Sequence, residues 1–258
     1  MNELYQTVCW EVADHVATVT LDRPDRLNSF NQQMLDEFRD VWARCRADDD
    51  IRVVVLRANG ERAFSTGVDR VDGRTRHPNP WSEDDPGFFL GAKQNRVWKP
   101  LIVAVHGMCA GGAFYWVNEA DVIICSDDAT FFDPHTTYGM VSALEPAGML
   151  RRMPFGDVMR IALFGLDERM SSSRAKEIGL VSEVLPREDL WPRAAELARR
   201  LAAKPPLAVQ GTVKAVWDSM SMSAQAAREI PLQYPQIGND AGKLDLKSAV
   251  RPEWELRD

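Results

Sequence analysis

The stretch KPLIVAVHGMCAGGA at residues 99–113 decides the fold class of this chain. Its apolar run, Leu101–Val105, is typical of a strand that is buried on both faces. Gly111 and Gly112 follow the strand and open a segment that we expect to be helical to about Asn118. This arrangement is typical of an α/β protein, and it places free backbone N–H groups at the carboxyl end of the strand. An oxyanion or a phosphate can bind such groups, although close packing of the helix against the strand would also explain the two glycines.

The residues before this stretch indicate two paired strands, a helix and a third strand. Val8–Val12 and Val16–Leu21 alternate apolar and polar residues, which is typical of half-buried strands. A helix capped by Ser29 or Asn31 is expected to run to about Ala47, because its apolar residues fall on one face. The β-branched run that follows it predicts a buried strand at residues 52–56.

The rest of the chain adds a long loop and many helices. Residues 70–92 are polar and rich in Pro and Gly, and long loops of this kind are usually functional. Strands are expected at 121–125, 129–132 and 180–185, and helices at about 147–153, 156–165, 172–178, 188–203, 206–219 and 222–236. Strands thus dominate the first half, and helices dominate the last third.

Composition excludes several classes of protein. The chain has 258 residues and a net charge of −7, which argues against general nucleic-acid binding. Its apolar runs fall far short of the roughly 20 residues of a membrane span. The N-terminus shows no signal peptide, and the four cysteines show no CxxC pair. We therefore expect reduced thiols in a cytoplasmic protein, without a metal site.

Four motifs in the expected order carry a resemblance to a known family. They are the RP…LN segment in Leu21–Asn28, the AF-x-x-G-x-D segment in Ala63–Asp69, the KPxIAAVxG…GG segment in Lys99–Gly107 with Ala110–Gly112, and the A-x-x-x-GLV segment in Ala175–Val181. Each motif is weak alone, but together they are specific over roughly residues 8–205. In these motifs the chain resembles the enoyl-CoA hydratase/isomerase (crotonase) superfamily.

The resemblance implies a fold, an assembly and a substrate. It implies an α/β spiral of β-β-α turns with a helical C-terminal trimerisation region. On this basis we expect an acyl-CoA-binding core at residues 1–200 and a helical region at 201–258. The expected assembly is a homotrimer or a homohexamer. The substrate would be an acyl-CoA, with CoA as part of that substrate and no further cofactor.

The resemblance also assigns residues to an acyl-CoA site. The backbone N–H groups of Val68 and Gly112 would form an oxyanion hole for the thioester enolate. The residues expected to line the CoA channel are Asp25, Arg26, Leu27, Thr66, Gly67, Val68, Asp69, Arg70 and Gly111. Among these residues, we expect Asp69 to be a structural cap rather than a base.

Both glutamates that serve the hydratases of this family are replaced. Tyr115 stands at the first position and His135 at the second. An imidazole with a pKa near 6.5 is a good base, whereas a phenol with a pKa of about 10 is a poor base and a possible acid. Glu145 is a further candidate, since other members carry an extra acid two residues earlier. Core packing would equally explain Tyr115 and His135, and a stabilised helix N-terminus would explain Glu145.

The sequence therefore indicates an acyl-CoA-processing enzyme that stabilises a thioester enolate by altered acid–base chemistry. It should be a poor hydratase of short straight-chain enoyl-CoA. Two alternatives stay open: a non-catalytic paralogue that binds acyl-CoA, and a hydrolase or isomerase acting on a bulky substrate. Aromatic residues hint weakly at a bulky pocket, namely Trp81, Phe88, Phe89, Phe114, Trp116, Phe131, Phe132 and Tyr138.

Overall fold

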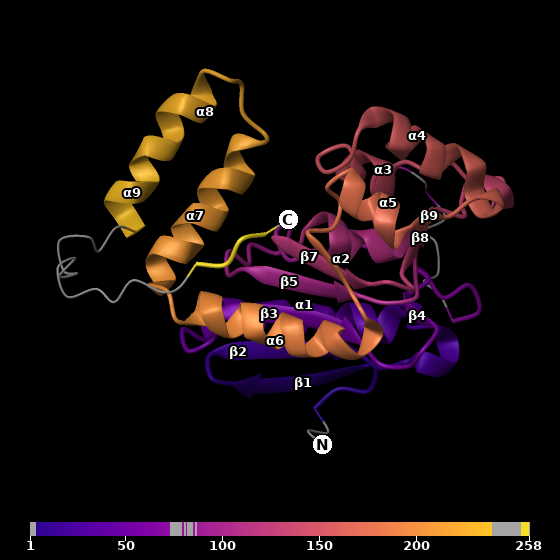
Figure 1. Cartoon of the computed structure of the whole chain (residues 1–258), viewed down its shortest axis with the longest axis horizontal. Coiled ribbons are helices and arrows are strands. Elements are labelled where there is room, and N and C mark those ends of the chain that lie inside the picture. Colours follow the sequence, from indigo (N-terminus) through magenta and orange to yellow (C-terminus); the bar gives the residue numbers. More distant parts are fainter. Residues whose placement is uncertain are drawn as a thin grey trace. The chain divides into compact units, whose positions relative to one another are not determined.

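The chain forms two compact units, Met1–Lys204 and Pro205–Asp258 (Figure 1). The computed structural model describes residues 4–72, 79, 81, 85, 87–238 and 254–257. The 70–92 loop thus lies partly outside the described residues. The domain boundary expected after residue 200 falls inside α6 (Arg187–Ala202), which ends two residues later.

The first unit is built around a six-stranded sheet with the strand order β1-β2-β3-β5-β7-β10. Its strands are β1 (Val8–Ala13), β2 (Val16–Leu21), β3 (Val53–Ala58), β5 (Leu101–Val105), β7 (Val122–Ser126) and β10 (Glu183–Leu185). β1 and β2 form an antiparallel hairpin, and every later neighbour pairs in parallel. The two central parallel strands, β3 and β5, contain the apolar runs that predicted buried strands.

A second sheet has the strand order β4-β6-β8-β9. Its strands are β4 (Ala63–Ser65), β6 (Met108–Ala110), β8 (Thr130–Phe132) and β9 (Met170–Ser171). From β3 to β8 the chain alternates strictly between the two sheets, one strand in each.

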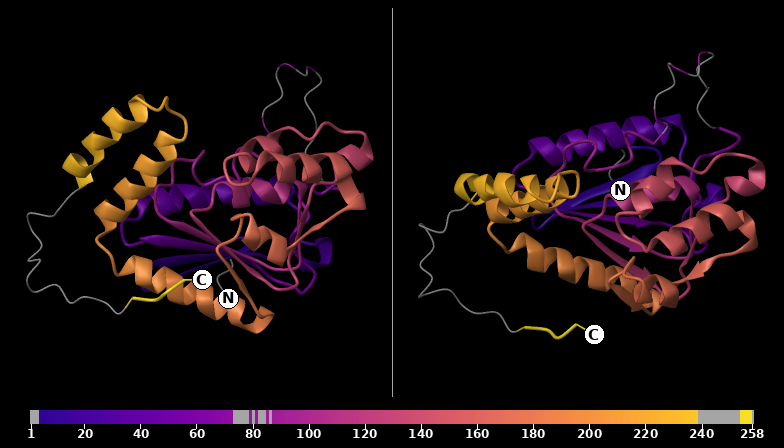
Figure 2. Two further views of the ribbon diagram at one scale, coloured as in Figure 1. Left: turned by 45° about the horizontal axis from the view of Figure 1, so that its top comes forward. Right: turned by 90° about the horizontal axis from the view of Figure 1, so that it is seen from above.

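Helices cover both faces of the larger sheet (Figure 2). Alternate residues of β3 point to opposite sides, since Val54 and Leu56 join one buried cluster and Val53 and Val55 join another. The first cluster contains the apolar face of α1 (Gln32–Ala47), and the second contains Leu190, Ala194, Ala198 and Ala202 of α6. The side chains on α6 recur every four residues, which places them on one helical face.

The remaining helices of the first unit are short. They are α2 (Phe114–Asn118), α3 (Leu144–Met149), α4 (Phe155–Phe164) and α5 (Ser172–Glu177). We expected a helix from residue 147, but α3 begins at Leu144 and includes Pro146. Proline is tolerated in the first turn of a helix because its missing N–H has no acceptor there.

The second unit contains α7 (Pro206–Ser219), α8 (Ala226–Glu229) and α9 (Gln233–Gly238). The single helix expected over 222–236 was wrong, since a 3₁₀ turn at Ile230–Leu232 separates α8 from α9. Pro231 has no backbone N–H, so the α-helical ladder cannot pass through it unbroken. In the described ranges, no helix is long and apolar enough to cross a membrane.

Candidate active site

Two glycine segments meet at the carboxyl ends of the second sheet's strands. Gly67 has a φ of +85°, and a Cβ atom added there would lie 2.7 Å from the backbone nitrogen of Gly112. Only glycine therefore allows these backbones to approach so closely. A parallel bridge joins Phe30 and Val68 through the carbonyl of Gly67 and the N–H of Asp69. The N–H of Val68 takes no part in that bridge and therefore points away from Phe30.

The turn before α1 lies against the same segment. Pro24–Arg26 forms a 3₁₀ turn, and Leu27 follows it in the left-handed conformation with a φ of 53°. The N–H of Thr66 donates to the carbonyl of Leu27 at 3.2 Å. The structure thus places two of the expected CoA-channel segments, residues 25–27 and 66–70, side by side.

Asp69 has a structural role, as expected. Its carboxylate accepts hydrogen bonds from the N–H groups of Val71 and Asp72 and pairs with Arg23 at 3.0 Å. Although burial opposes ionisation, these partners hold the pKa of Asp69 below its usual value. The salt bridge between Arg23 and Asp69 also joins the RP…LN motif to the AF-x-x-G-x-D motif.

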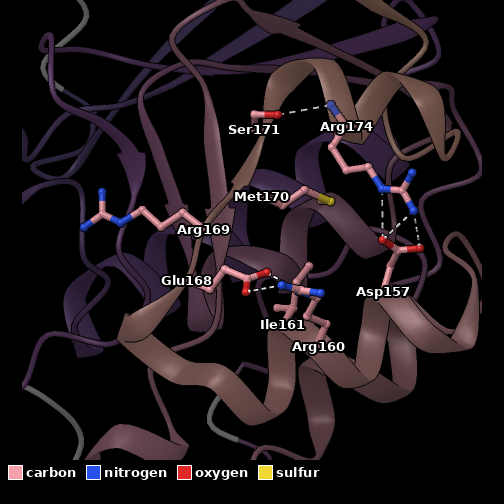
Figure 3. Close-up of a pocket in the computed structure, with 8 residues that line it drawn as sticks. All are labelled: Asp157, Arg160, Ile161, Glu168, Arg169, Met170, Ser171 and Arg174. Carbon is pink, nitrogen blue, oxygen red and sulfur yellow. Dashed lines mark hydrogen bonds and ion pairs between the residues drawn. The ribbon is translucent and has the colours of Figure 1, made fainter.

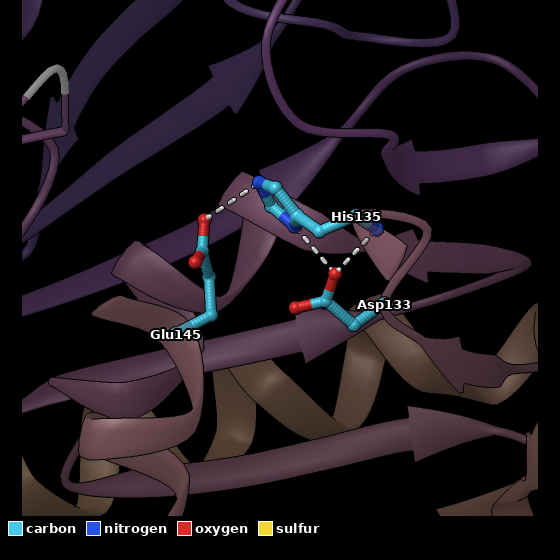
Figure 4. Close-up of side chains that lie close together, drawn as sticks. All are labelled: Asp133, His135 and Glu145. Atoms are coloured by element: carbon cyan, nitrogen blue, oxygen red, sulfur yellow. Dashed lines mark hydrogen bonds and ion pairs between the residues drawn. The ribbon is translucent and has the colours of Figure 1, made fainter. Parts of the chain in front are cut away.

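Three ionisable side chains form a compact cluster after β8 (Figure 4). Asp133 follows β8, His135 begins the next turn, and Glu145 lies in the first turn of α3. His135 Nδ1 lies 2.5 Å from Asp133 Oδ1, and His135 Nε2 lies 4.0 Å from Glu145 Oε1. Asp133 is fully buried and also accepts a hydrogen bond from the Ser142 hydroxyl at 2.8 Å. The histidine therefore lies between two carboxylates, one at each ring nitrogen.

The electrostatics of this cluster favour a charged histidine between the two acids. The hydrogen bond to Asp133 raises the pKa of His135 above its usual value, against the effect of burial. Burial opposes ionisation of Asp133, but the hydrogen bonds from His135 and Ser142 lower its pKa. Burial raises the pKa of Glu145. Two carboxyl groups in one cluster thus differ in their affinity for a proton, as acid–base chemistry requires.

The cluster adjoins the glycine segment. Gly111 has a φ of +51°, and a Cβ atom added to it would lie 3.7 Å from Cε1 of His135. Arg70 stacks over the ring of Tyr138, with its guanidinium carbon 4.1 Å from the ring centroid. The glycine segment and the Asp69–Arg70 segment both reach the turn that holds His135. The structure thus brings the expected oxyanion and base residues into one region.

Tyr115 points its hydroxyl at a residue that sequence reasoning missed. The hydroxyl donates to Asp85 Oδ1 at 2.7 Å, although 30 positions separate the two residues. Burial, the hydrogen bond to Asp85 and the charge of Glu145 all raise the pKa of Tyr115. Nothing in the sequence marked Asp85, because it lies in a loop that carries several acidic residues.

The Asp133–His135–Glu145 cluster fits acid–base chemistry better than metal binding. The two carboxylates lie at opposite nitrogens of the imidazole. One ligand atom from each of the three residues lies within 4.8 Å of the other two, but Asp133 Oδ1 is already 2.5 Å from the Nδ1 nitrogen of His135. Catalytic zinc sites use three protein ligands.

Three of the eight aromatic residues considered for the acyl pocket belong to the main core. Phe114, Trp116 and Phe131 are fully buried in the main core, so core packing accounts for them. Trp81 is 94% exposed, and Phe88 and Tyr138 are nearly half exposed. Tyr138 remains near the site through its contact with Arg70.

A charged pocket of about 350 Å³ lies apart from this site, beside α4 and β9 (Figure 3). Arg160 pairs with Glu168, and Arg174 pairs with Asp157 at 3.0 Å. Arg169 stacks over the ring of Phe132. The charge of this pocket is therefore largely neutralised by its own side chains.

Comparison with known proteins places the whole fold in one family. Residues 11–237 match the family model described as enoyl-CoA hydratase/isomerase. The chain is 33% identical over 233 residues to an (E)-benzylidenesuccinyl-CoA hydratase of Thauera aromatica, covering 88% of this chain and 85% of that protein. It is 32% identical over 255 residues to a carnitinyl-CoA dehydratase of Escherichia coli, covering 94% and 95%.

Solved structures agree with the sequence matches. An enoyl-CoA hydratase/isomerase from Mycobacterium paratuberculosis superposes with a TM-score of 0.85 at 34% identity, covering 92% of this chain and 93% of that one. The match to the family model and the identity to these relatives show that this chain belongs to the enoyl-CoA hydratase/isomerase family. Its mixed α/β fold is that of the crotonases, and the family's members act on acyl-CoA.

Proposed function

We propose that this protein stabilises the enolate of an acyl-CoA thioester and moves the α-proton with His135 rather than with a glutamate. The observation that carries the proposal is the position of His135. Its ring adjoins Gly111 of the glycine segment and is held by the buried carboxylate of Asp133. A base that is oriented by a carboxylate beside an oxyanion site is the arrangement that enolate formation needs.

Each residue then has a distinct role. The N–H groups of Val68 and Gly112 would bind the thioester oxygen, where charge develops in the enolate. His135 would exchange a proton with the α-carbon, and Asp133 would orient the imidazole. Glu145 would take part as the second acid, since burial raises its pKa. Residues 25–27 and 66–70 would bind CoA, largely through their backbone.

The proposed reaction is the reversible hydration of a bulky or branched enoyl-CoA. Two relatives are named for a hydratase and a dehydratase acting on benzylidenesuccinyl-CoA and carnitinyl-CoA. Neither name refers to crotonyl-CoA. Because Tyr115 and His135 stand at the usual glutamate positions, we expect hydration of crotonyl-CoA to be slower by about 10²–10⁴ than in ordinary hydratases.

The test is exchange of the α-proton. Butanoyl-CoA incubated with the protein in D₂O should gain deuterium, which mass spectrometry detects. His135→Gln should lower the exchange rate by about 10²–10⁴ while thioester binding persists. The matched control is His15→Asn at the β1–β2 turn, where asparagine suits the φ of 67°. An unchanged exchange rate in His135→Gln would contradict the assignment, and thioester binding without exchange in the wild type would support a non-catalytic paralogue.

We also propose that the chain assembles as a trimer or a hexamer through its helical C-terminal unit. Several apolar side chains of that unit are exposed, including Leu232 at 67% and Ile237 at 79%. A contiguous exposed apolar surface marks an interaction site, and we infer that these side chains form one in the assembly. Sedimentation velocity at micromolar concentration should show a trimer or larger, and a stable monomer would count against the proposal.

A further inference from the structure

The geometry of the Asp85–Tyr115 pair directs the phenol proton of Tyr115 to the carboxylate of Asp85. A phenol carries a single donor hydrogen, and in Tyr115 it is directed to Asp85 Oδ1 at 2.7 Å. The same carboxylate oxygen accepts the N–H of Gly87 at 2.9 Å. The N–H of Gly87 also interacts with the phenol oxygen, so one of the two lone pairs of that oxygen remains for another donor.

The ring of Tyr115 is held in place by its surroundings. A Cβ atom added at Gly87 would lie 2.3 Å from the ring atom Cε2, so this position admits only glycine without a shift. Phe30 meets the ring edge-on, with 6.5 Å between centroids. Tyr115 is half-buried, and it interacts electrostatically with Glu145 of the Asp133–His135–Glu145 cluster. Phe30 also lies against the glycine segment, because a Cβ atom added to Gly112 would lie 2.6 Å from Phe30 Cε1. Tyr115 and the proposed oxyanion site therefore share Phe30 as a neighbour.

We propose that Asp85 positions Tyr115 and accepts its proton, so that the two residues together replace the carboxylate missing from α2. This inference rests on the proposed function above. Asp85 acts only through Tyr115, so it is a positioning residue rather than a group that touches the substrate.

The proton transfers balance in the hydration direction. A water molecule gives one proton to the Tyr115 oxygen while Tyr115 passes its own proton to Asp85. The resulting hydroxide bonds to the β-carbon, and the π electrons of the double bond move to the thioester oxygen. Protonated His135 then delivers a proton to the α-carbon. Asp85 ends protonated and His135 neutral, and exchange of one proton with solvent at each residue restores the starting state.

A merely structural role for the pair makes different predictions. In that case Asp85 only anchors the backbone near Gly87 to α2, and an amide would serve almost as well as a carboxylate. Asp85→Asn keeps the size and a hydrogen-bond acceptor for Tyr115, but it cannot take up the proton at neutral pH. This variant therefore separates proton uptake from anchoring.

Two reactions distinguish the role of the proton relay, formed by Tyr115 and Asp85, from the role of the base, His135. Hydration of cinnamoyl-CoA needs the relay and His135, whereas α-deuterium exchange into butanoyl-CoA needs only His135. Asp85→Asn and Tyr115→Phe should each lower kcat for hydration by about 10²–10⁴ with little change in KM. The double variant should be no slower than either single variant, because the two residues act as one unit. All three variants should keep wild-type deuterium exchange. Asp36→Asn, on the exposed face of α1, is the matched control.

Other outcomes overturn the inference. Wild-type hydration in Asp85→Asn, or equal loss of hydration and exchange in a variant whose circular dichroism is unchanged, would contradict the relay. Exchange without any hydration of cinnamoyl-CoA by the wild type would overturn the relay and the proposed hydration, but it would leave His135 assigned as the base of α-proton exchange. A wild-type protein that neither exchanges nor hydrates would overturn the proposed function, and the relay with it.

Discussion

The Asp133→Asn substitution tests whether His135 is an oriented base. Asp133 is fully buried, and its Oδ1 accepts both the backbone N–H of His135 at 3.0 Å and its Nδ1 at 2.5 Å. Asparagine keeps the shape but removes the charge, and its amide can hold the imidazole in the wrong tautomer. Because a base in the wrong tautomer cannot accept the α-proton, we expect kcat for α-deuterium exchange to fall by about 10²–10⁴.

The pH dependence of the residual exchange gives a second readout. The base must be neutral, so the rate rises with pH through the pKa of His135. The hydrogen bond to Asp133 raises this pKa, and the charge of Glu145 adds to the effect. In the wild type, the midpoint of the acidic limb of the pH–rate profile should therefore lie above about pH 6.5. In Asp133→Asn it should move to lower pH, because burial, which lowers the pKa of His135, is then opposed only by Glu145.

Stability should change in a defined pH window. The raised pKa of His135 stabilises the fold at low pH, and this contribution is lost as the pH rises through the folded pKa. The lowered pKa of Asp133 stabilises the fold at higher pH, and this contribution is lost as the pH falls. Both contributions are present together between about pH 4 and 6.5. We expect Asp133→Asn to lose about 1.5–3 kcal/mol there, measured by urea unfolding.

The assay needs only butanoyl-CoA, D₂O and mass spectrometry over a range of pH. Ser142→Ala is the matched control, since it removes a hydrogen bond to Asp133 Oδ2 without touching His135. It should cost little activity and move the acidic limb only slightly. An Asp133→Asn protein with the wild-type rate, or with its acidic limb unmoved, would refute the role assigned to this pair.

Two further substitutions probe the oxyanion site and the scaffold. Gly67→Ala should lower the rate of α-deuterium exchange by at least about 10²–10³-fold, because the added Cβ would lie 2.7 Å from the Gly112 nitrogen. The control for backbone strain is Gly139→Ala, which has a similar φ of +69° but open space around it. Equal loss of exchange in both variants would contradict the steric argument. Lys93→Met should lower the free energy of unfolding in urea by about 3–5 kcal/mol, because it removes the ammonium that lies 2.7 Å from the Asp121 carboxylate. A loss below about 1 kcal/mol would show that this salt bridge contributes little to stability.

The sequence correctly predicted those strands and helices for which the side-chain pattern and the backbone requirements agree. β2, β5 and α7 begin and end where the apolar runs and the turn residues placed them. The prediction failed in the segment after α7, where a helical pattern of side chains coexists with Pro231. The side-chain periodicity there favours one continuous helix, but Pro231 lacks the backbone N–H that such a helix needs, so the helix is interrupted.

Local spacing can reveal only those contacts of the site that the chain itself brings together. Asp133 and His135 are two positions apart, and the Asp133 carboxylate accepts the His135 N–H in a local turn. That spacing was a usable signal. The contact between Asp85 and Tyr115 joins a loop to a helix through tertiary packing, so no local pattern reveals it.

The relocation of the acids has a structural logic. In this chain the ionisable groups occupy the end of β8, the start of α3 and the loop before Gly87, while α2 contributes a phenol. The glycine segment that would stabilise the enolate does not depend on any of these side chains, because its donors are backbone N–H groups held by Gly67 and Gly112. The means of enolate stabilisation can therefore be kept while the acids and bases around it change. A substitution in the glycine segment should accordingly lower both exchange and hydration, whereas substitutions in the Asp85–Tyr115 pair should lower hydration alone.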